Sequence, residues 1–135
     1  MATVSSAGEL PLRNQNDIVL GRQAVRRLAQ EQGFSLVDQT KLVTAASELA
    51  RNALIYGGGG ELKWETLLDG GRRGVRLVFE DHGPGIPDIE QAMTDGWTSG
   101  NGLGLGLTGA RRLVNEFELQ TTVGVGTRVI IARWK

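Results

Sequence analysis

Two polar residues that could do chemistry lie four positions apart in the segment SELARN, residues 47–52. Glu48 and Asn52 fall on one face of a predicted helix, one turn apart. A carboxylate can accept a proton from an attacking hydroxyl, and an amide oxygen is a hard ligand that suits Mg²⁺. The same spacing also fits two solvated side chains on a helix surface, so this pair alone leaves both interpretations open.

A second candidate site is the segment EDHGPGIP, residues 80–87, which comes directly after a predicted strand. An aspartate at the end of a strand, here Asp81, can accept a hydrogen bond from a purine amino group. Gly83 and Gly85 let the backbone bend tightly beside a flat ring. An ordinary turn is the equal alternative, since the two prolines and two glycines would serve that purpose unaided.

The segment GNGLGLGL, residues 100–107, is a candidate phosphate-binding loop ahead of a predicted helix. Alternating glycines free successive backbone N–H groups to face an anion, and the helix N-terminus adds partial positive charge. A flexible linker is the alternative, but linkers favour serine over leucine, and the leucines here favour a loop that packs. The spacing matches neither a P-loop nor a dinucleotide-binding fingerprint.

The helices and strands that must position these segments follow from apolar periodicity and turn residues. We predict a strand at 10–13, helices at 17–32 and 35–56, a hairpin of 62–68 with 75–79, a short helix at 88–93, a helix at 109–117, and a hairpin of 119–123 with 128–134. Asp17 and Ser35 are the predicted N-caps of the two long helices, and Asp38 completes a capping box. This order predicts an α/β (α+β) two-layer sandwich, in which helices cover one face of a mostly antiparallel sheet.

The composition argues against several other classes of function. The 135 residues have the length of one ordinary domain, spanning 1–135. Fifteen basic and fifteen acidic side chains cancel, which disfavours nucleic acid or anionic lipid as a partner. The chain has no cysteine and one histidine, so thiol chemistry is excluded and a zinc site is disfavoured. No run approaches the ~18 apolar residues of a membrane span and no signal-peptide pattern is present, so we expect a cytoplasmic protein without membrane contact.

Four motifs occur in a fixed order between Glu48 and Thr127. They are E-x-x-x-N on a helix, D-x-G-x-G-I after a strand, G-x-G-x-G before a helix and G-x-G-T between the last strands. This order resembles the Bergerat-fold GHKL ATPases, a family that includes histidine kinases, gyrase B, heat-shock protein 90 and the anti-sigma-factor serine kinases. The segments DIVLGRQ, SELARNALIY, EDHGPGIPDI, DGWTSG, GLGLGL and the terminal ARW look like the RsbT-type switch kinases of the bacterial stressosome.

The resemblance implies an ATP- and Mg²⁺-dependent protein serine/threonine kinase that acts in partner switching. Its substrates would be STAS-domain scaffold and antagonist proteins, and on release it would activate a downstream effector, often a PP2C-like phosphatase. The alternative is a nucleotide-gated binding module that sequesters partners with little or no phosphotransfer. An intact pair of Glu48 and Asn52 favours the kinase, because a pure binder has no need of a base there.

The resemblance also implies roles for individual residues. Glu48 would be the catalytic base, Asn52 would hold Mg²⁺ and the nucleotide, and Asp81 would read the adenine amino group. The remaining expected nucleotide contacts are Gly83, Gly85 and Ile86 at the adenine, Gly102, Leu103, Gly104, Leu105 and Gly106 at the phosphates, and Thr127 beside Asp81 or the purine. The chain departs from some relatives because no lysine or arginine lies between Asp95 and Leu107. A run of four glycines at 57–60 is also longer than a helix stop requires, and the sequence does not explain it.

Overall fold

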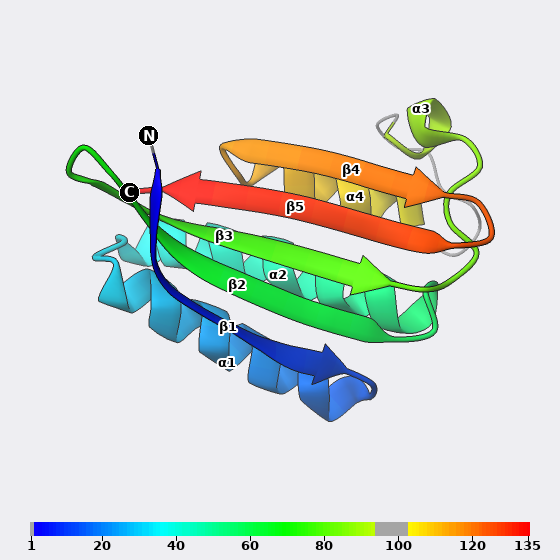
Figure 1. Ribbon diagram of the computed structural model, residues 1–135, viewed down its shortest axis with the longest axis horizontal. Coiled ribbons are helices and arrows are strands. Elements are labelled where there is room, and N and C mark those ends of the chain that lie inside the picture. Colours follow the sequence, from blue (N-terminus) through cyan, green and yellow to red (C-terminus); the bar gives the residue numbers. More distant parts are fainter. Residues whose placement is uncertain (1, 94–102) are drawn as a thin grey trace.

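A computed structural model of the chain describes residues 2–93 and 103–135, and Figure 1 shows a sheet with helices packed on one of its faces. The sheet has the strand order β1-β2-β3-β5-β4, and every neighbouring pair is antiparallel. Its strands are β1 (Thr3–Leu12), β2 (Gly60–Asp69), β3 (Arg72–Asp81), β4 (Glu116–Thr122) and β5 (Gly126–Trp134). The predicted two-layer sandwich with a mostly antiparallel sheet is therefore confirmed.

Two long helices begin at side-chain caps that the sequence supplies. In α1 (Gln15–Glu31) the N-cap is Asn14 rather than the predicted Asp17. The Asn14 side chain accepts a hydrogen bond from the Asp17 backbone N–H. The Asp17 carboxylate in turn accepts one from the Arg13 backbone N–H. In α2 (Leu36–Ile55) the predicted cap Ser35 is confirmed, since its hydroxyl accepts from the Asp38 N–H at 3.1 Å. Satisfied N–H groups at each start fix where the helices begin.

Two predicted elements differ most in their bounds from the structure, and the first is the N-terminal strand. A strand was expected at 10–13, whereas β1 covers Thr3–Leu12. Its first residues lack an apolar alternation, yet the strand pairs with β2 along nearly its whole length. Gly8 makes this possible, because a Cβ there would clash with the Trp64 ring, lying 2.6 Å from its Cε2 atom. Pairing with β2, rather than its own pattern, extends this strand.

The second difference concerns the last helix, predicted at 109–117. Helix α4 covers Leu103–Arg112, and Phe117 lies in β4 instead. Leu107 and Ala110 are buried in the core from the helix, and Phe117 packs on that core from the sheet. The prediction was wrong because apolar residues at the end of the helix and in the next strand happen to recur at helical spacing. Burial of α4 also offsets the low helix propensity of its three glycines.

The core lies between the central strand and the helices. Its packing brings several segments together at one end of the molecule. Alternate β3 residues Val75, Leu77 and Phe79 belong to the same buried cluster as Leu42 and other apolar residues of α2. The carboxyl ends of β3 and α2, the turn between β4 and β5, and the short α3 (Ile89–Ala92) all lie at this same end (Figure 1). Among helices in the described ranges, none combines the length and apolar character of a membrane crossing.

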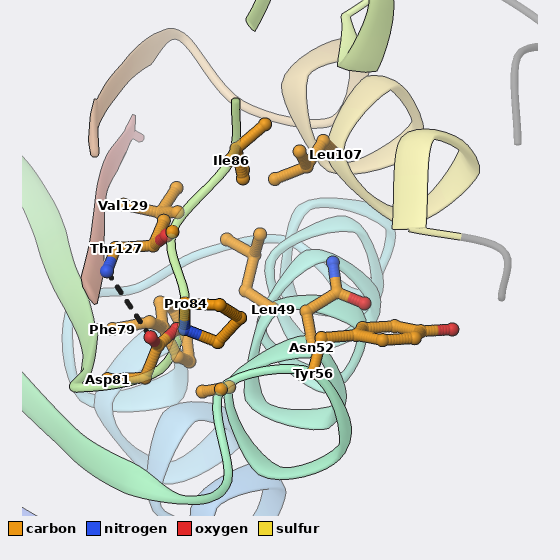
Figure 2. Close-up of a pocket in the computed structure, with 13 residues that line it drawn as sticks. Leu49, Asn52, Tyr56, Phe79, Asp81, Pro84, Ile86, Leu107, Thr127 and Val129 are labelled. Atoms are coloured by element: carbon orange, nitrogen blue, oxygen red, sulfur yellow. Dashed lines mark hydrogen bonds between the residues drawn. The ribbon is translucent and has the colours of Figure 1, made fainter. Parts of the chain in front are cut away.

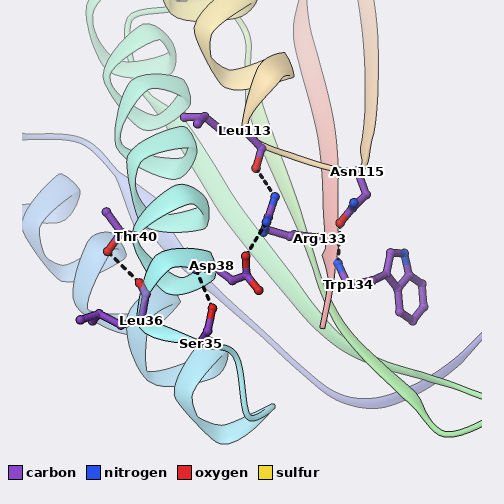
Figure 3. Close-up of polar contacts among 8 residues, drawn as sticks. All are labelled: Ser35, Leu36, Asp38, Thr40, Leu113, Asn115, Arg133 and Trp134. Atoms are coloured by element: carbon purple, nitrogen blue, oxygen red, sulfur yellow. Dashed lines mark hydrogen bonds and ion pairs between the residues drawn. The ribbon is translucent and has the colours of Figure 1, made fainter.

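At the opposite end, one arginine ties three elements together (Figure 3). Arg133 of β5 donates to the Asp38 carboxylate at 2.6 Å and to the Leu113 carbonyl at 2.8 Å, just beyond α4. Its side chain is only 14% exposed. The hydrogen bond from Arg133 lowers the pKa of the Asp38 carboxyl, although partial burial opposes the shift. The pair therefore joins the start of α2 to the end of α4 through β5.

Asp38→Asn tests this contact. The variant should lose about 1 kcal/mol of stability at neutral pH, a value kept small because the carboxylate is partly exposed. Since the pKa is lowered in the folded state, the wild-type contribution is present above the ordinary carboxyl value of 3.8 and is lost as pH falls through the folded value. Urea unfolding at neutral and acid pH should show the gap between the two proteins closing in acid. A gap independent of pH would contradict an ionic contribution.

Candidate functional site

A cavity of about 220 Å³ opens between α2, the loop after β3 and the start of α4 (Figure 2). Its polar lining includes Asn52 of α2, Asp81 of β3 and Thr127 of β5. Apolar side chains form most of the remaining wall: Leu49, Phe79, Ile86, Leu107 and Val129. A mostly apolar cleft with a few fixed polar groups suits a flat ring that carries polar atoms at its edge.

Asp81 is held at the floor of this cavity by backbone donors. Its Oδ1 accepts hydrogen bonds from Gly83 N at 3.0 Å and from Thr127 N at 3.2 Å. These donors come from the loop after β3 and from β5, so two separate segments fix the orientation of the carboxylate. Within the part of the chain that the structure describes, no donor pairs with Oδ2. That oxygen remains an acceptor for a ligand donor.

Two glycines of the run at 57–60 pack closely against the end of β3, Gly57 on the Asp81 side chain and Gly60 on the backbone. A Cβ on Gly57 would lie 2.6 Å from Asp81 Oδ2, and a Cβ on Gly83 would lie 2.6 Å from Gly57 Cα. A Cβ on Gly60 would meet the backbone carbonyl of Glu80. The first and last glycines of the run therefore pack closely beside the carboxylate and its strand, which the sequence interpretation missed. The repeated glycines were the signal, but their neighbour becomes evident only when α2 and β3 are placed together.

Asn52 brings a buried amide with an unmet hydrogen bond to the cavity. Its Nδ2 is buried and, among the described residues, has no hydrogen-bond partner. Helix α4 approaches it at Gly106, where a Cβ would lie 2.8 Å from Nδ2 and 3.2 Å from Oδ1. An unpaired buried amide costs about 1–3 kcal/mol unless a ligand pairs with it. Turned one way the amide donates to a phosphate oxygen, and turned the other way it offers an oxygen to a cation.

Glu48 lies on α2 one turn before Asn52, as the spacing predicts, but it does not line the cavity. Its side chain is half-buried. The structure therefore places a carboxylate near the cavity on the same helix as the unpaired amide. In this position the Glu48 carboxylate is suited to contact a group that approaches the cavity from outside. It is less suited to contact the ligand inside the cavity.

The loop after β3 is braced by the end of β4 and by the turn that follows it. Ile86 N donates to the Thr121 hydroxyl at 2.9 Å, and Gly124 N donates to the Pro84 carbonyl at 2.9 Å. Gly85 has a φ of +78°, and a Cβ there would lie 2.6 Å from the Thr122 carbonyl oxygen. Only glycine fits this position without strain. The loop predicted as a purine site is thus held in one shape by a second segment.

The glycine-rich stretch predicted as a loop differs from that expectation. Leu103, Gly104, Leu105 and Gly106 form the first residues of α4 rather than a loop ahead of it. Gly102, and with it residues 95–102 of the stretch that lacks lysine and arginine, lie outside the described residues. In the described part of this stretch, the backbone N–H groups that could face an anion are therefore those of the N-terminus of α4.

The chain matches a known protein family and curated relatives over most of its length. A family described as histidine kinase-, DNA gyrase B-, and HSP90-like ATPase matches residues 37–135. The serine/threonine-protein kinase RsbT of Bacillus subtilis (strain 168) is 47% identical over 118 residues, covering 87% of this chain and 89% of that protein. An anti-sigma F factor of Clostridium novyi (strain NT) is 30% identical over 128 residues, covering 90% and 87% respectively.

A solved structure supports the same architecture. The RsbU and RsbW domains of a Mycobacterium tuberculosis protein match with a TM-score of 0.66 at 21% identity, over 97% of this chain and 33% of that longer chain. At this identity the likeness bears on the fold alone. The family match, over residues 37–135, extends across the cavity and the motifs that form it. The chain therefore belongs to the histidine kinase-, DNA gyrase B- and HSP90-like ATPase family, and groups within it with the serine/threonine kinases of the RsbT type.

Proposed function

We propose that the protein is an ATP- and Mg²⁺-dependent kinase that phosphorylates serine or threonine on STAS-domain scaffold and antagonist proteins. On release from them it activates a downstream effector such as a PP2C-like phosphatase. The observation that carries the proposal is the cavity that combines the braced carboxylate of Asp81 with the unpaired amide of Asn52. The 47% identity to a serine/threonine-protein kinase supports the same activity.

In this proposal the adenine ring occupies the apolar part of the cavity. Asp81 Oδ2 accepts from the exocyclic amino group, because its partner Oδ1 is already engaged by two backbone amides. Gly83, Gly85 and Ile86 shape the loop beside the ring, and Thr127 braces Asp81 from β5. A rigid acceptor that needs no reorganisation on binding strengthens recognition of the base.

The phosphate groups lie between Asn52 and the start of α4. Gly102, Leu103, Gly104, Leu105 and Gly106 would contact them through backbone N–H groups, aided by the positive end of the helix. Mg²⁺ would be held with the help of Asn52, where it supplies charge neutralisation for the phosphates. The buried amide without a partner fits both contacts, because either orientation of the group gains a hydrogen bond or a ligand bond.

Glu48 acts on the substrate hydroxyl in this scheme. The hydroxyl oxygen forms a bond to the γ-phosphorus, the bond to the β–γ bridging oxygen breaks, and ADP leaves with that oxygen. The proton of the hydroxyl passes to the Glu48 carboxylate. The half-buried position outside the cavity lining suits an acceptor presented by a second protein. We place this reaction in the cytoplasm, where ATP is available.

Incubation with Mg-ATP and purified STAS-domain proteins from the same organism tests the proposal. Mass spectrometry should locate one added phosphate on a serine or threonine of a partner, and chelation of Mg²⁺ with EDTA should prevent it. If ATP binds and changes partner affinity while no partner gains phosphate, the nucleotide-gated binding module replaces the kinase.

Gly106→Ala tests the contact between α4 and Asn52. The added methyl would displace the Asn52 amide, so ATP affinity should fall roughly tenfold, or about 1.4 kcal/mol. Stability should change little, because alanine gains up to about 1 kcal/mol of helix propensity over glycine. Gly109→Ala is the matched control, since a Cβ on Gly109 meets nothing within 4 Å. Calorimetric titration with ATP and thermal melts of both variants measure the two effects. Equal ATP affinities of Gly106→Ala and Gly109→Ala would contradict the role given to Asn52.

A further inference from the structure

Thr121 of β4 is the centre of a small hydrogen-bond cluster at the wall of the cavity. Its Oγ1 accepts from Ile86 N at 2.9 Å and lies 3.2 Å from the Gly126 carbonyl oxygen. It also lies 3.0 Å from the Thr127 hydroxyl. Ile86 and Thr127 line the cavity, whereas Thr121 does not. One hydroxyl thus connects the loop after β3 to the strand that braces Asp81.

The hydrogen atoms of this cluster have one arrangement that satisfies every contact. A threonine hydroxyl carries one donor hydrogen and two acceptor lone pairs. The carbonyl of Gly126 can only accept, so the Thr121 hydrogen goes to it. Ile86 N–H can only donate, and it takes one lone pair of Thr121. The remaining lone pair accepts the hydrogen of Thr127.

This arrangement decides what Thr127 can offer to a ligand. Its only hydroxyl hydrogen is directed at Thr121, so its lone pairs alone are available on the cavity side. Asp81 Oδ2 is likewise an acceptor. The wall therefore presents acceptors that match an amino group and disfavour a carbonyl oxygen. Adenine carries an amino group at position 6, where guanine carries a carbonyl, so a guanine ring in the same pose would set a carbonyl oxygen against these acceptors.

We propose that Thr121 is a positioning residue that selects adenine over guanine by keeping the Thr127 hydroxyl in its acceptor orientation. The proposal rests on the nucleotide-binding role given to the cavity, and it adds the origin of base selectivity. Without the Thr121 hydroxyl, Thr127 is free to rotate and donate to a guanine carbonyl. The effect should therefore appear in the ratio of the two affinities rather than in either one alone.

The test measures dissociation constants for ATP and GTP with wild type, Thr121→Val and Thr121→Ser. In Thr121→Val the preference for ATP should fall roughly tenfold, while Thr121→Ser keeps the hydroxyl and should keep the wild-type ratio. Thr122→Val is the matched control, because its exposed side chain lies on the other face of β4. Should the valine variant not fold, Thr121→Ala removes the same hydroxyl and should give the same loss of preference.

Each outcome has a distinct meaning. A merely structural role for Thr121 would weaken ATP and GTP binding equally, and an unchanged ratio in the valine or alanine variant overturns the inference. If serine behaves like valine, the hydroxyl is not responsible and the inference is also overturned. Failure of the wild type to bind ATP at all would instead overturn the proposed function on which the inference depends.

Discussion

Glu48→Gln should slow phosphate transfer by about 100-fold or more while leaving ATP affinity close to that of the wild type. Glutamine keeps the size of the side chain but cannot take the proton of the acceptor hydroxyl at neutral pH. ATP affinity should persist because Glu48 does not line the cavity. Single-turnover transfer of labelled γ-phosphate to a partner, measured beside calorimetric titration with ATP, separates the two effects.

Glu9→Gln provides the control for this experiment. Glu9 is an exposed glutamate on the edge strand β1, away from the cavity lining, so its substitution should leave both transfer and binding unchanged. If Glu48→Gln transfers phosphate at the wild-type rate, Glu48 is not the base. If it loses ATP binding as well as transfer, Glu48 supports the nucleotide site instead.

Asp81→Asn should weaken ATP binding by roughly 100-fold, or about 2.7 kcal/mol. The asparagine oxygen can still accept from Gly83 N and Thr127 N, where Asp81 Oδ1 now accepts. The amino group then replaces Oδ2 and faces the amino group of adenine, so two donors meet and an acceptor is lost. Calorimetric titration with ATP measures the loss, and thermal melts should show a smaller change because the backbone contacts persist.

Glu80→Gln is the neighbouring control for Asp81. Glu80 pairs with Lys63 at 3.3 Å and Arg128 at 3.4 Å, outside the cavity lining. Successive strand residues point to opposite faces, so this change should leave ATP affinity unaltered. Equal affinity in Asp81→Asn and wild type would show that the carboxylate does not read the base.

Local signals in the sequence were sufficient for several elements. Ser35 followed by Asp38 predicted the start of α2, and the structure confirms that cap. The hairpin of β2 and β3 follows from two apolar runs separated by a glycine-containing turn, although β3 continues two residues beyond the predicted end, to Asp81. In each case the decisive contacts join residues close in sequence, so residue type and spacing carry enough information.

Other features depend on contacts between distant segments. Gly57 matters because Asp81 packs against it, and Gly106 matters because Asn52 lies opposite it on another helix. The hydroxyl of Thr121 matters because it accepts a hydrogen bond from Ile86 N, 35 residues earlier. Single-sequence patterns report local periodicity and turn chemistry, so close approaches of this kind become evident only once the sheet and helices are assembled.

Hydrogen exchange of the whole chain with and without Mg-ATP tests most directly that this cavity is the nucleotide site. Bound ATP should slow exchange at backbone amides in three segments: 52–60 at the end of α2, 81–86 after β3 and 126–127 at the start of β5. The outer strand β1 should be unaffected. If ATP binds but protection appears on β1 or on the outer surface of α1 while these three segments exchange as before, the assignment of the site is wrong.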